Sequence, residues 1–178
     1  MIYFTSDHHF EHRNIISYCK RGYESAHEMN EDLIRIWNET ITRRDEVYYL
    51  GDFGLGSKEV LKSILKRLNF KRITLVKGNH DKCNKAMLEI GFTEVHKYMD
   101  LKLEGKTLFL SHVPMVSCYH DICICGHVHD KFQINGNIFN VGVDANGLIP
   151  VSKEDLFVKY WQSLNANNFL PMDLEVHE

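Results

Sequence analysis

The sequence has no long hydrophobic run, and its apolar stretches fall far short of the roughly 20 residues that a membrane-spanning helix needs. It has no excess of basic residues either, because 21 Lys and Arg face 24 Asp and Glu, for a formal net charge of −3. Without a global basic field, we expect neither a membrane nor long nucleic acid among the partners. A small phosphate-bearing ligand in one local site is compatible with this charge.

Internal repeats, linkers and low-complexity tracts are also absent. The 178 residues therefore predict one domain over residues 1–164, followed by a polar tail over residues 165–178 that is either docked or frayed. The opening residues, MIYFTSDHH, lack the charged start and apolar core of a signal peptide, so we expect a cytoplasmic protein.

Paired Cys-x-x-Cys motifs are a further absence. The cysteines are odd in number and lack the spacing of a small disulfide scaffold, so we expect free thiols at Cys19, Cys83, Cys118, Cys123 and Cys125. Cys123 and Cys125 lie two positions apart on a predicted strand, so both side chains should be buried on the same face. Without paired motifs, a structural zinc site is disfavoured.

The sequence does contain a series of strands that each end in polar residues. Apolar and β-branched runs predict buried strands at 2–6, 46–50 and 72–76, with helices between them capped by Ser25 and Ser57. This order is typical of an α/β fold with a largely parallel sheet. After residue 93 the pattern changes, and we expect hairpins around 104–106 and at Asn135-Gly136, then a last helix at about 152–164.

Asp, His and Asn side chains follow five predicted strands, in the order Asp7 and His9, Asp52, Asn79-His80-Asp81, His112, and His127 with His129. Ligand sites in open α/β sheets lie just beyond the carboxyl ends of strands, so these groups should meet at one edge. Each motif alone is commonly a turn, but five such coincidences are hard to explain as turns. Strand alternation should point Asp7 and His9 the same way and His8 the opposite way.

Imidazole nitrogens combined with carboxylate and amide oxygens suit Zn²⁺, Mn²⁺ or iron better than Ca²⁺. Even seven of the nine side chains named above are too many for one tetrahedral ion. They would fit two ions about 3.5–4 Å apart, the geometry that hydrolyses phosphate esters.

The complete series resembles the motif set of the calcineurin-like metallophosphoesterases, in the family's order: Asp7-x-His9, Gly51-Asp52, Gly78-Asn79-His80-Asp81, His112 and Gly126-His127-x-His129. The flanking stretches HFEHRNII and NVGVD…PVS resemble a small bacterial and phage subgroup. The resemblance implies two packed mixed β-sheets flanked by helices, a four-layer sandwich. It also implies hydrolysis of a phosphate ester by a metal-bridging hydroxide, with a phosphodiester favoured over a phosphomonoester.

Carried over to this chain, the resemblance implies one metal held by Asp7, His9 and His129, and a second held by Asn79, His112 and His127, with Asp52 bridging both. His80 would stabilise the transition state or protonate the leaving oxygen, and Asp81 would orient His80. The expected cofactors are two divalent ions, Mn, Zn or Fe, and the expected substrate is a small phosphate ester such as a nucleotide.

His12, Arg13 and Asn14 form a second tier, because they precede a predicted helix start where backbone N–H groups favour anions. They are candidate substrate contacts, although a solvated helix start explains them equally well. Tyr119 and His120 are weaker candidates for lining the same pocket. Two other functions stay open: a non-catalytic binding or scaffold protein on the same fold, and a nuclease acting on short nucleic acid. The complete ligand set and His80 argue against the scaffold.

Overall fold

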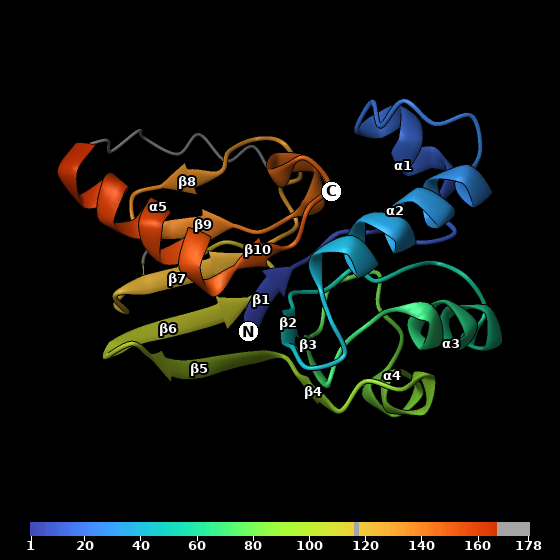
Figure 1. The fold of residues 1–178 in the computed structure, drawn as a ribbon, viewed down its shortest axis with the longest axis horizontal. Coiled ribbons are helices and arrows are strands. Elements are labelled where there is room, and N and C mark those ends of the chain that lie inside the picture. Colours follow the sequence, from blue (N-terminus) through green and yellow to red (C-terminus); the bar gives the residue numbers. More distant parts are fainter. Residues whose placement is uncertain (116–117, 167–178) are drawn as a thin grey trace.

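Two five-stranded β-sheets packed face to face organise the chain, of which the computed structural model describes residues 1–115 and 118–166 (Figure 1). The first sheet has the order β10-β1-β2-β3-β4, formed by β1 (Ile2–Thr5), β2 (Glu46–Tyr49), β3 (Arg72–Val76), β4 (Glu94–His96) and β10 (Val151–Ser152). Strands β1 to β4 are parallel, as the β-α-β-α-β order predicts, and β10 is antiparallel to β1.

The second sheet has the order β5-β6-β7-β9-β8, formed by β5 (Tyr98–Leu103), β6 (Lys106–Ser111), β7 (Ile122–Cys125), β8 (Ile134–Asn135) and β9 (Ile138–Asn140). Strands β6, β7 and β9 are parallel, while β5 and β8 pair antiparallel at the two edges. Both predicted hairpins are present. The predicted α/β fold with two mixed sheets is therefore confirmed.

Serine caps begin three of the helices that connect these strands. The helices are α1 (Arg13–Tyr18), α2 (Ala26–Thr40), α3 (Lys58–Arg67), α4 (Asn84–Ile90) and α5 (Lys153–Ala166), with a 3₁₀ turn at Val143–Asn146. Ser25, Ser57 and Ser152 each accept a bond from the backbone N–H three residues ahead, at 3.1, 3.3 and 3.0 Å. The predicted tail begins within α5, and residues 167–178 lie outside the described residues.

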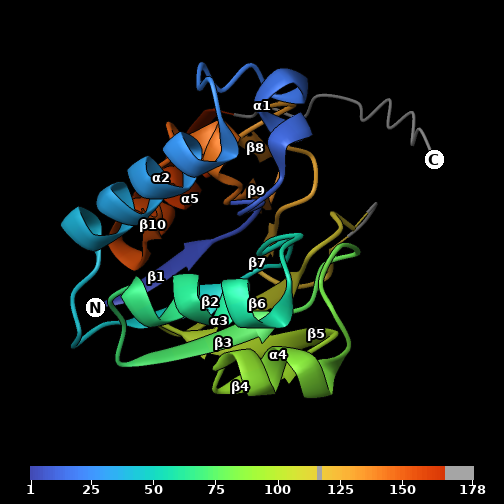
Figure 2. The same ribbon diagram turned by 90° about the vertical axis from the view of Figure 1, so that its right-hand side faces the viewer.

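The two apolar cores lie on opposite faces of the first sheet. On the outer face, α2, α3 and α4 cover β1 to β4 and bury side chains such as Trp37 and Leu61 (Figure 2). Between the sheets, Phe4 and Leu50 pack against Leu110 of the second sheet, and Leu156 of α5 joins them. This double packing fixes the strand ends relative to one another. None of the described helices is both long and apolar enough to cross a bilayer.

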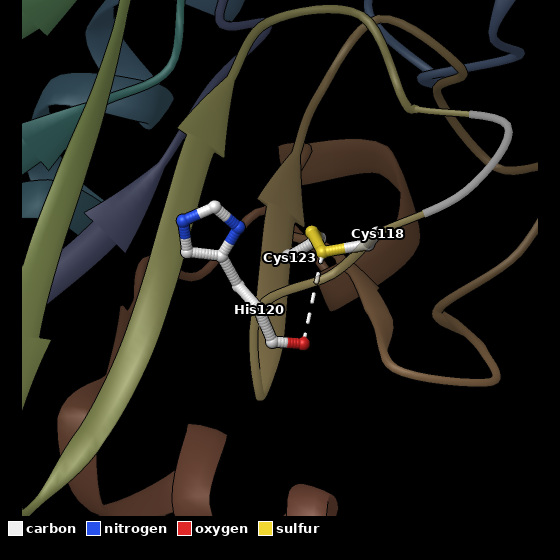
Figure 3. A group of neighbouring side chains, drawn as sticks. All are labelled: Cys118, His120 and Cys123. Carbon is white, nitrogen blue, oxygen red and sulfur yellow. Dashed lines mark hydrogen bonds between the residues drawn. A yellow bond between two sulfur atoms is a disulfide. The ribbon is translucent and has the colours of Figure 1, made fainter.

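One cysteine prediction is wrong, because Cys118 and Cys123 are joined in a disulfide (Figure 3). Their Cα atoms lie 6.3 Å apart, and Cys118 packs against the apolar cluster that contains Cys123 on the second sheet. Sequence spacing does not reveal this packing. Cys19, Cys83 and Cys125 are free, as predicted, and Cys125 is buried on the same face of β7 as Cys123.

Candidate metal centre

The candidate site residues lie just beyond the ends of five strands. Each predicted metal ligand follows within four positions of the last residue of its strand, and those last residues are Thr5, Tyr49, Val76, Ser111 and Cys125. Because β1, β2 and β3 are parallel, and β6 and β7 are parallel, their carboxyl ends share an edge in each sheet. The topology therefore brings together side chains that are up to 122 positions apart, from Asp7 to His129.

Left-handed backbone conformations aim five of these side chains. The φ angle is 61° at Asp7, 52° at His9, 59° at Asp52, 71° at His127 and 49° at His129. Residues other than glycine rarely adopt this region, and such strain concentrates at functional sites. Strand alternation is thus the wrong explanation for the shared direction of Asp7 and His9, because β1 ends at Thr5.

Asp7, His9 and His129 form a first cluster, in which one ligand atom from each lies within 4.8 Å of the others. Asp7 and His9 are buried, with His9 Nε2 4.0 Å from Asp7 Oδ1. Among the described residues, only four buried side-chain polar atoms lack a hydrogen-bond partner, and Asp7 Oδ1 and His9 Nε2 are two of them. Buried polar atoms are nearly always satisfied, so this pair fits a cation held between them.

Asp52, His112 and His127 form a second cluster with the same 4.8 Å limit between ligand atoms. His112 Nε2 lies 3.0 Å from Asn79 Oδ1 and 3.4 Å from Asp52 Oδ2. On the other side of the ring, His112 Nδ1 donates to the Leu50 carbonyl at 2.7 Å. That bond leaves Nε2 facing Asp52, which is the orientation that metal-binding histidines show.

Asp52 lies between the two clusters. Its Oδ2 is 3.6 Å from His9 Nε2 and 3.4 Å from His112 Nε2, while its Oδ1 accepts the His80 backbone N–H at 2.9 Å. One carboxylate therefore faces a histidine from each cluster.

Two glycines permit this close approach. A Cβ at Gly51, where φ is 90°, would lie 2.6 Å from His112 Nδ1. A Cβ at Gly126 would lie 2.5 Å from Asp7 Oδ2. Both distances are too short for a side chain, so the glycines that precede Asp52 and His127 are sterically required.

The structure assigns Asp81 contacts that differ from the predicted one. Its two oxygens accept the backbone N–H groups of Asp52, Phe53 and Gly78 at 2.8–2.9 Å. Among the described residues, no hydrogen bond joins Asp81 to His80. Asp81 therefore holds the turns of Asp52 and Asn79 together. His80 is exposed, and its ring packs edge-on to His9 with centroids 5.4 Å apart.

Arg21 and Asp144 support the first cluster, and sequence reasoning missed both. Asp144 Oδ2 accepts a bond from His129 Nδ1 at 2.7 Å, which leaves His129 Nε2 free. Arg21 forms a two-point bond to Asp144 at 2.7 and 2.8 Å and also donates to the backbone carbonyls of Asp7 and His8, both at 2.6 Å. The Asp in NVGVD was the available signal for this pair, although nothing in the sequence links it to His129.

Neither His8 nor His12 belongs to a cluster, as predicted, and the two lie in different surroundings. His8 is buried away from the clusters, and its Nδ1 lies 2.8 Å from the Tyr49 hydroxyl. His12 is half-buried and close to His9, with 3.4 Å between their Nδ1 atoms. Arg13 and Asn14 are exposed on α1, and within the described chain neither forms a hydrogen bond or ion pair with a cluster. Their proposed substrate contacts stay a prediction.

Each cluster combines one histidine whose pKa is lowered, His9 or His127, with one whose pKa is raised, His129 or His112. Burial lowers the pKa of His9 to about 3, so this ring is neutral. Burial also disfavours a charge on His112 and His129, but the neighbouring Asp52 and Asp144 carboxylates outweigh it and raise the pKa values to about 9 and about 10. Despite burial, the bond to His112 lowers the pKa of Asp52 to about 2, so its carboxylate is charged and available as a ligand.

A cavity of about 610 Å³ adjoins the second cluster. Asn79 and His112 form its inner wall, and Lys77, Lys97, Tyr98, Phe109 and Met115 are among its other lining residues. This volume is within the range of small-molecule sites. Tyr119 and His120, the weaker sequence candidates, do not line it.

Comparison with known proteins agrees with this geometry. Residues 1–142 match the calcineurin-like phosphoesterase superfamily domain. An uncharacterized protein of Methanocaldococcus jannaschii is 35% identical over 170 residues, and the match covers 89% of each chain. The crystal structure of a protein of unknown function from Aquifex aeolicus is similar with a TM-score of 0.72 and 28% identity, over 89% of this chain and 98% of that chain. The chain belongs to the calcineurin-like phosphoesterase superfamily.

Proposed function

We propose that this chain hydrolyses a phosphate ester at a centre of two divalent cations. Asp7, His9 and His129 would hold the first cation, and Asn79, His112 and His127 the second. The observation that carries the proposal is the position of Asp52 Oδ2, within 3.6 Å of a histidine nitrogen from each cluster. A carboxylate there can bridge two ions and offset their repulsion.

Two bound cations would activate water for attack and neutralise charge on the phosphate oxygens. The protein residues prepare this centre. The carbonyl of Leu50 and the carboxylate of Asp144 each accept an Nδ1–H, so the Nε2 atoms of His112 and His129 stay directed at the ions. The left-handed turns of the first cluster hold the remaining donors without further rearrangement.

His80 is placed to act on the substrate rather than on an ion. Its backbone N–H is anchored to Asp52, while its ring is exposed beside His9. In its protonated form, the ring would donate a hydrogen bond to a phosphate oxygen and then transfer the proton to the leaving oxygen. Proton transfer of this kind contributes roughly 10²–10⁴ in rate.

The cavity beside the second cluster supports a substrate with an organic group attached to phosphate. Tyr98 and Phe109 offer aromatic surface with ring centroids 5.9 Å apart, and Lys77 and Lys97 offer positive charge. His12, which lies beside His9, and the exposed ring of Tyr18, with centroids 6.3 Å apart, would contact a second group. A small phosphodiester, such as a nucleotide derivative, would use both sides.

Metal analysis combined with hydrolysis assays tests the proposal. Purified protein loaded in turn with Mn²⁺, Zn²⁺ and Fe²⁺ should hold two ions per chain and hydrolyse an aryl phosphodiester faster than the matching monoester. His80→Ala should keep both ions and lose turnover. Protein that binds no metal and hydrolyses neither ester with any of the three ions would instead be a scaffold on this fold.

A further inference from the structure

A second group of metal-ligating side chains lies away from the proposed centre, on β7 and on the segment that leads into it. Cys118, His120 and Cys123 each offer one ligand atom, and these atoms lie within 4.8 Å of one another. In Figure 3 the His120 ring stands beside the Cys118–Cys123 disulfide, with Nδ1 on the side of the sulfurs and Nε2 on the far side. The group contains no residue of the two clusters.

We propose that the reduced form of this segment binds one soft divalent cation, such as Zn²⁺, through Cys118 Sγ, Cys123 Sγ and His120 Nδ1. The disulfide is the oxidised form of the same site, in which both sulfur ligands are consumed. Two thiolates and one imidazole are a donor set that zinc prefers over Mg²⁺ or Ca²⁺. Two tetrahedral Zn–S bonds of about 2.3 Å separate their sulfurs by about 3.8 Å, so the two sulfurs would move apart after reduction to hold an ion between them.

The far side of the His120 ring supports this assignment. His120 Nε2 lies 2.8 Å from Asp100 Oδ1, so a carboxylate faces this side of the ring. Nδ1 faces the sulfurs and is the nitrogen that would bind the ion (Figure 3). A carboxylate that accepts the second N–H of a histidine is the usual partner of a metal-bound imidazole. Phe109 packs on the ring, with centroids 5.3 Å apart, and further restricts it.

Asn137 holds the backbone of the segment in the shape that brings the ligands together. Its Nδ2 donates to the carbonyls of Cys118 and His120, at 3.4 and 2.9 Å. Its own carbonyl accepts the Cys123 backbone N–H at 2.8 Å. Cys123 is buried whereas Cys118 and His120 are half-exposed, so a water molecule can complete a four-coordinate site.

The change between the two forms balances as a thiol–disulfide exchange. A low-molecular-weight disulfide, RSSR, takes two electrons from the metal-bound thiolates of Cys118 and Cys123 and leaves as two RS⁻, which take up two protons from water to become two RSH. The protein gains one S–S bond and releases the cation, because a disulfide sulfur is no longer a thiolate ligand. A dithiol reductant restores the binding form.

Cobalt binding gives a signal specific to this site. The proposed metal centre has only nitrogen and oxygen donors, so a thiolate-to-cobalt charge-transfer band in the near ultraviolet must come from a cysteine. We expect reduced protein saturated with Co²⁺ to show this band. It should be lost in Cys118→Ser, in Cys123→Ser and after oxidation with RSSR. Asp100→Asn should keep the band and weaken cobalt binding there about 10–100-fold.

Two matched controls identify the cysteines responsible. Cys83→Ser removes an exposed thiol and should leave the band unchanged. Cys19→Ser should also leave it unchanged, although Cys19 lies within ligand distance of His129 and Asp144. The proposal would be overturned if the band disappeared only in Cys19→Ser. It would also be overturned if reduced, cobalt-saturated wild-type protein showed no band.

Protection of the thiols provides a second measurement that needs no variant. With Zn²⁺ bound, reduced wild-type protein should show slow alkylation at Cys118 and Cys123, while the exposed Cys83 reacts at its metal-free rate. Equal alkylation of Cys118 and Cys123 with and without Zn²⁺ would contradict the site. Neither readout depends on phosphate-ester hydrolysis, so each stands whether or not the enzyme proposal holds.

Discussion

The two clusters of the proposed metal centre differ in how completely they are satisfied without an ion. In the first, Asp7 Oδ1 and His9 Nε2 are buried and have no hydrogen-bond partner among the described residues. In the second, His112 Nε2 already contacts both Asn79 and Asp52. The first cluster thus contains metal-ligand atoms without a hydrogen-bond partner, whereas the ligand atoms of the second cluster contact one another.

The two clusters also differ in the residues that support them and in their exposure to solvent. The first cluster rests on the buried Arg21–Asp144 ion pair, and the second borders the cavity, where Asn79 is exposed. Unsatisfied buried ligands on a rigid support favour tight binding, since the ion removes a desolvation cost. We therefore expect the first cluster to bind its ion more tightly and the second to exchange its ion with solvent and substrate more readily.

Asp52→Ala should cause the largest effect, because this carboxylate faces both clusters. Without it the bridge and its negative charge are lost, so both ions should dissociate on dialysis and hydrolysis should fall to background. Metal analysis and the aryl phosphodiester assay measure the two losses. Retention of both ions with full activity would show that Asp52 does not bridge them.

Asp144→Asn should weaken one cluster selectively. The neutral amide no longer stabilises the His129 Nδ1–H as a carboxylate does, and such supporting residues typically contribute about 10–100-fold to metal affinity. Competition with a chelator should show this loss for the tighter ion only. The matched control, Asp32→Asn, changes a half-buried aspartate that also pairs with an arginine, Arg35, and should change neither affinity. Equal weakening of both ions would contradict the division between the clusters.

The sequence allowed the strand order of the first half, the helix caps and the grouping of site residues at strand ends to be predicted. These follow from local signals, namely apolar runs, Ser25 and Ser57 caps, and polar residues after each run. The reason for the shared direction of Asp7 and His9 could not be predicted, because left-handed φ angles at non-glycine residues have no reliable sequence signal.

Pairings that depend on tertiary packing could not be predicted either. Arg21 reaches Asp144 across 123 positions, and the Cys118–Cys123 disulfide depends on a loop that folds back onto β7. Neither pairing follows from periodicity, since each depends on the final packing of the sheets. Asp81 shows the same limit, because the family resemblance implied that it orients His80, whereas its carboxylate accepts three backbone N–H groups instead.

Lower pH should reduce the affinity for both ions by a smaller amount that grows with each pH unit. The pKa values of His112 and His129 are raised to about 9 and about 10, from an ordinary value near 6.5. Below these values each ring carries a proton that an ion must displace, so each ion should lose up to about tenfold in affinity per pH unit. Metal titrations at pH 6, 7 and 8 test this, and a pH-independent affinity would contradict it.

For the metal-free protein, raising the pH rather than lowering it should reduce the stability of the folded state. A histidine with a raised pKa stabilises the folded state fully below its unfolded value near 6.5, and this stabilisation is lost as the pH rises through about 9 to 10. Thermal unfolding of chelator-treated protein should therefore show falling stability over that range, while the metal-loaded protein should not follow it.

Lys97→Ala should have the smallest effect on hydrolysis. Together with its control it tests whether the substrate's charge is bound in the cavity beside the second cluster or over α1 beside the first. Lys97 lines the cavity but is exposed, so its attraction to an anionic substrate is worth about 0.2–1 kcal/mol. KM should rise by at most about fivefold with kcat unchanged. Arg13→Ala is the matched control on α1, where the exposed side chain makes no described contact with either cluster, and its KM should change less. A larger change for Arg13→Ala would place the charged end of the substrate over α1, with the cavity holding only its apolar group.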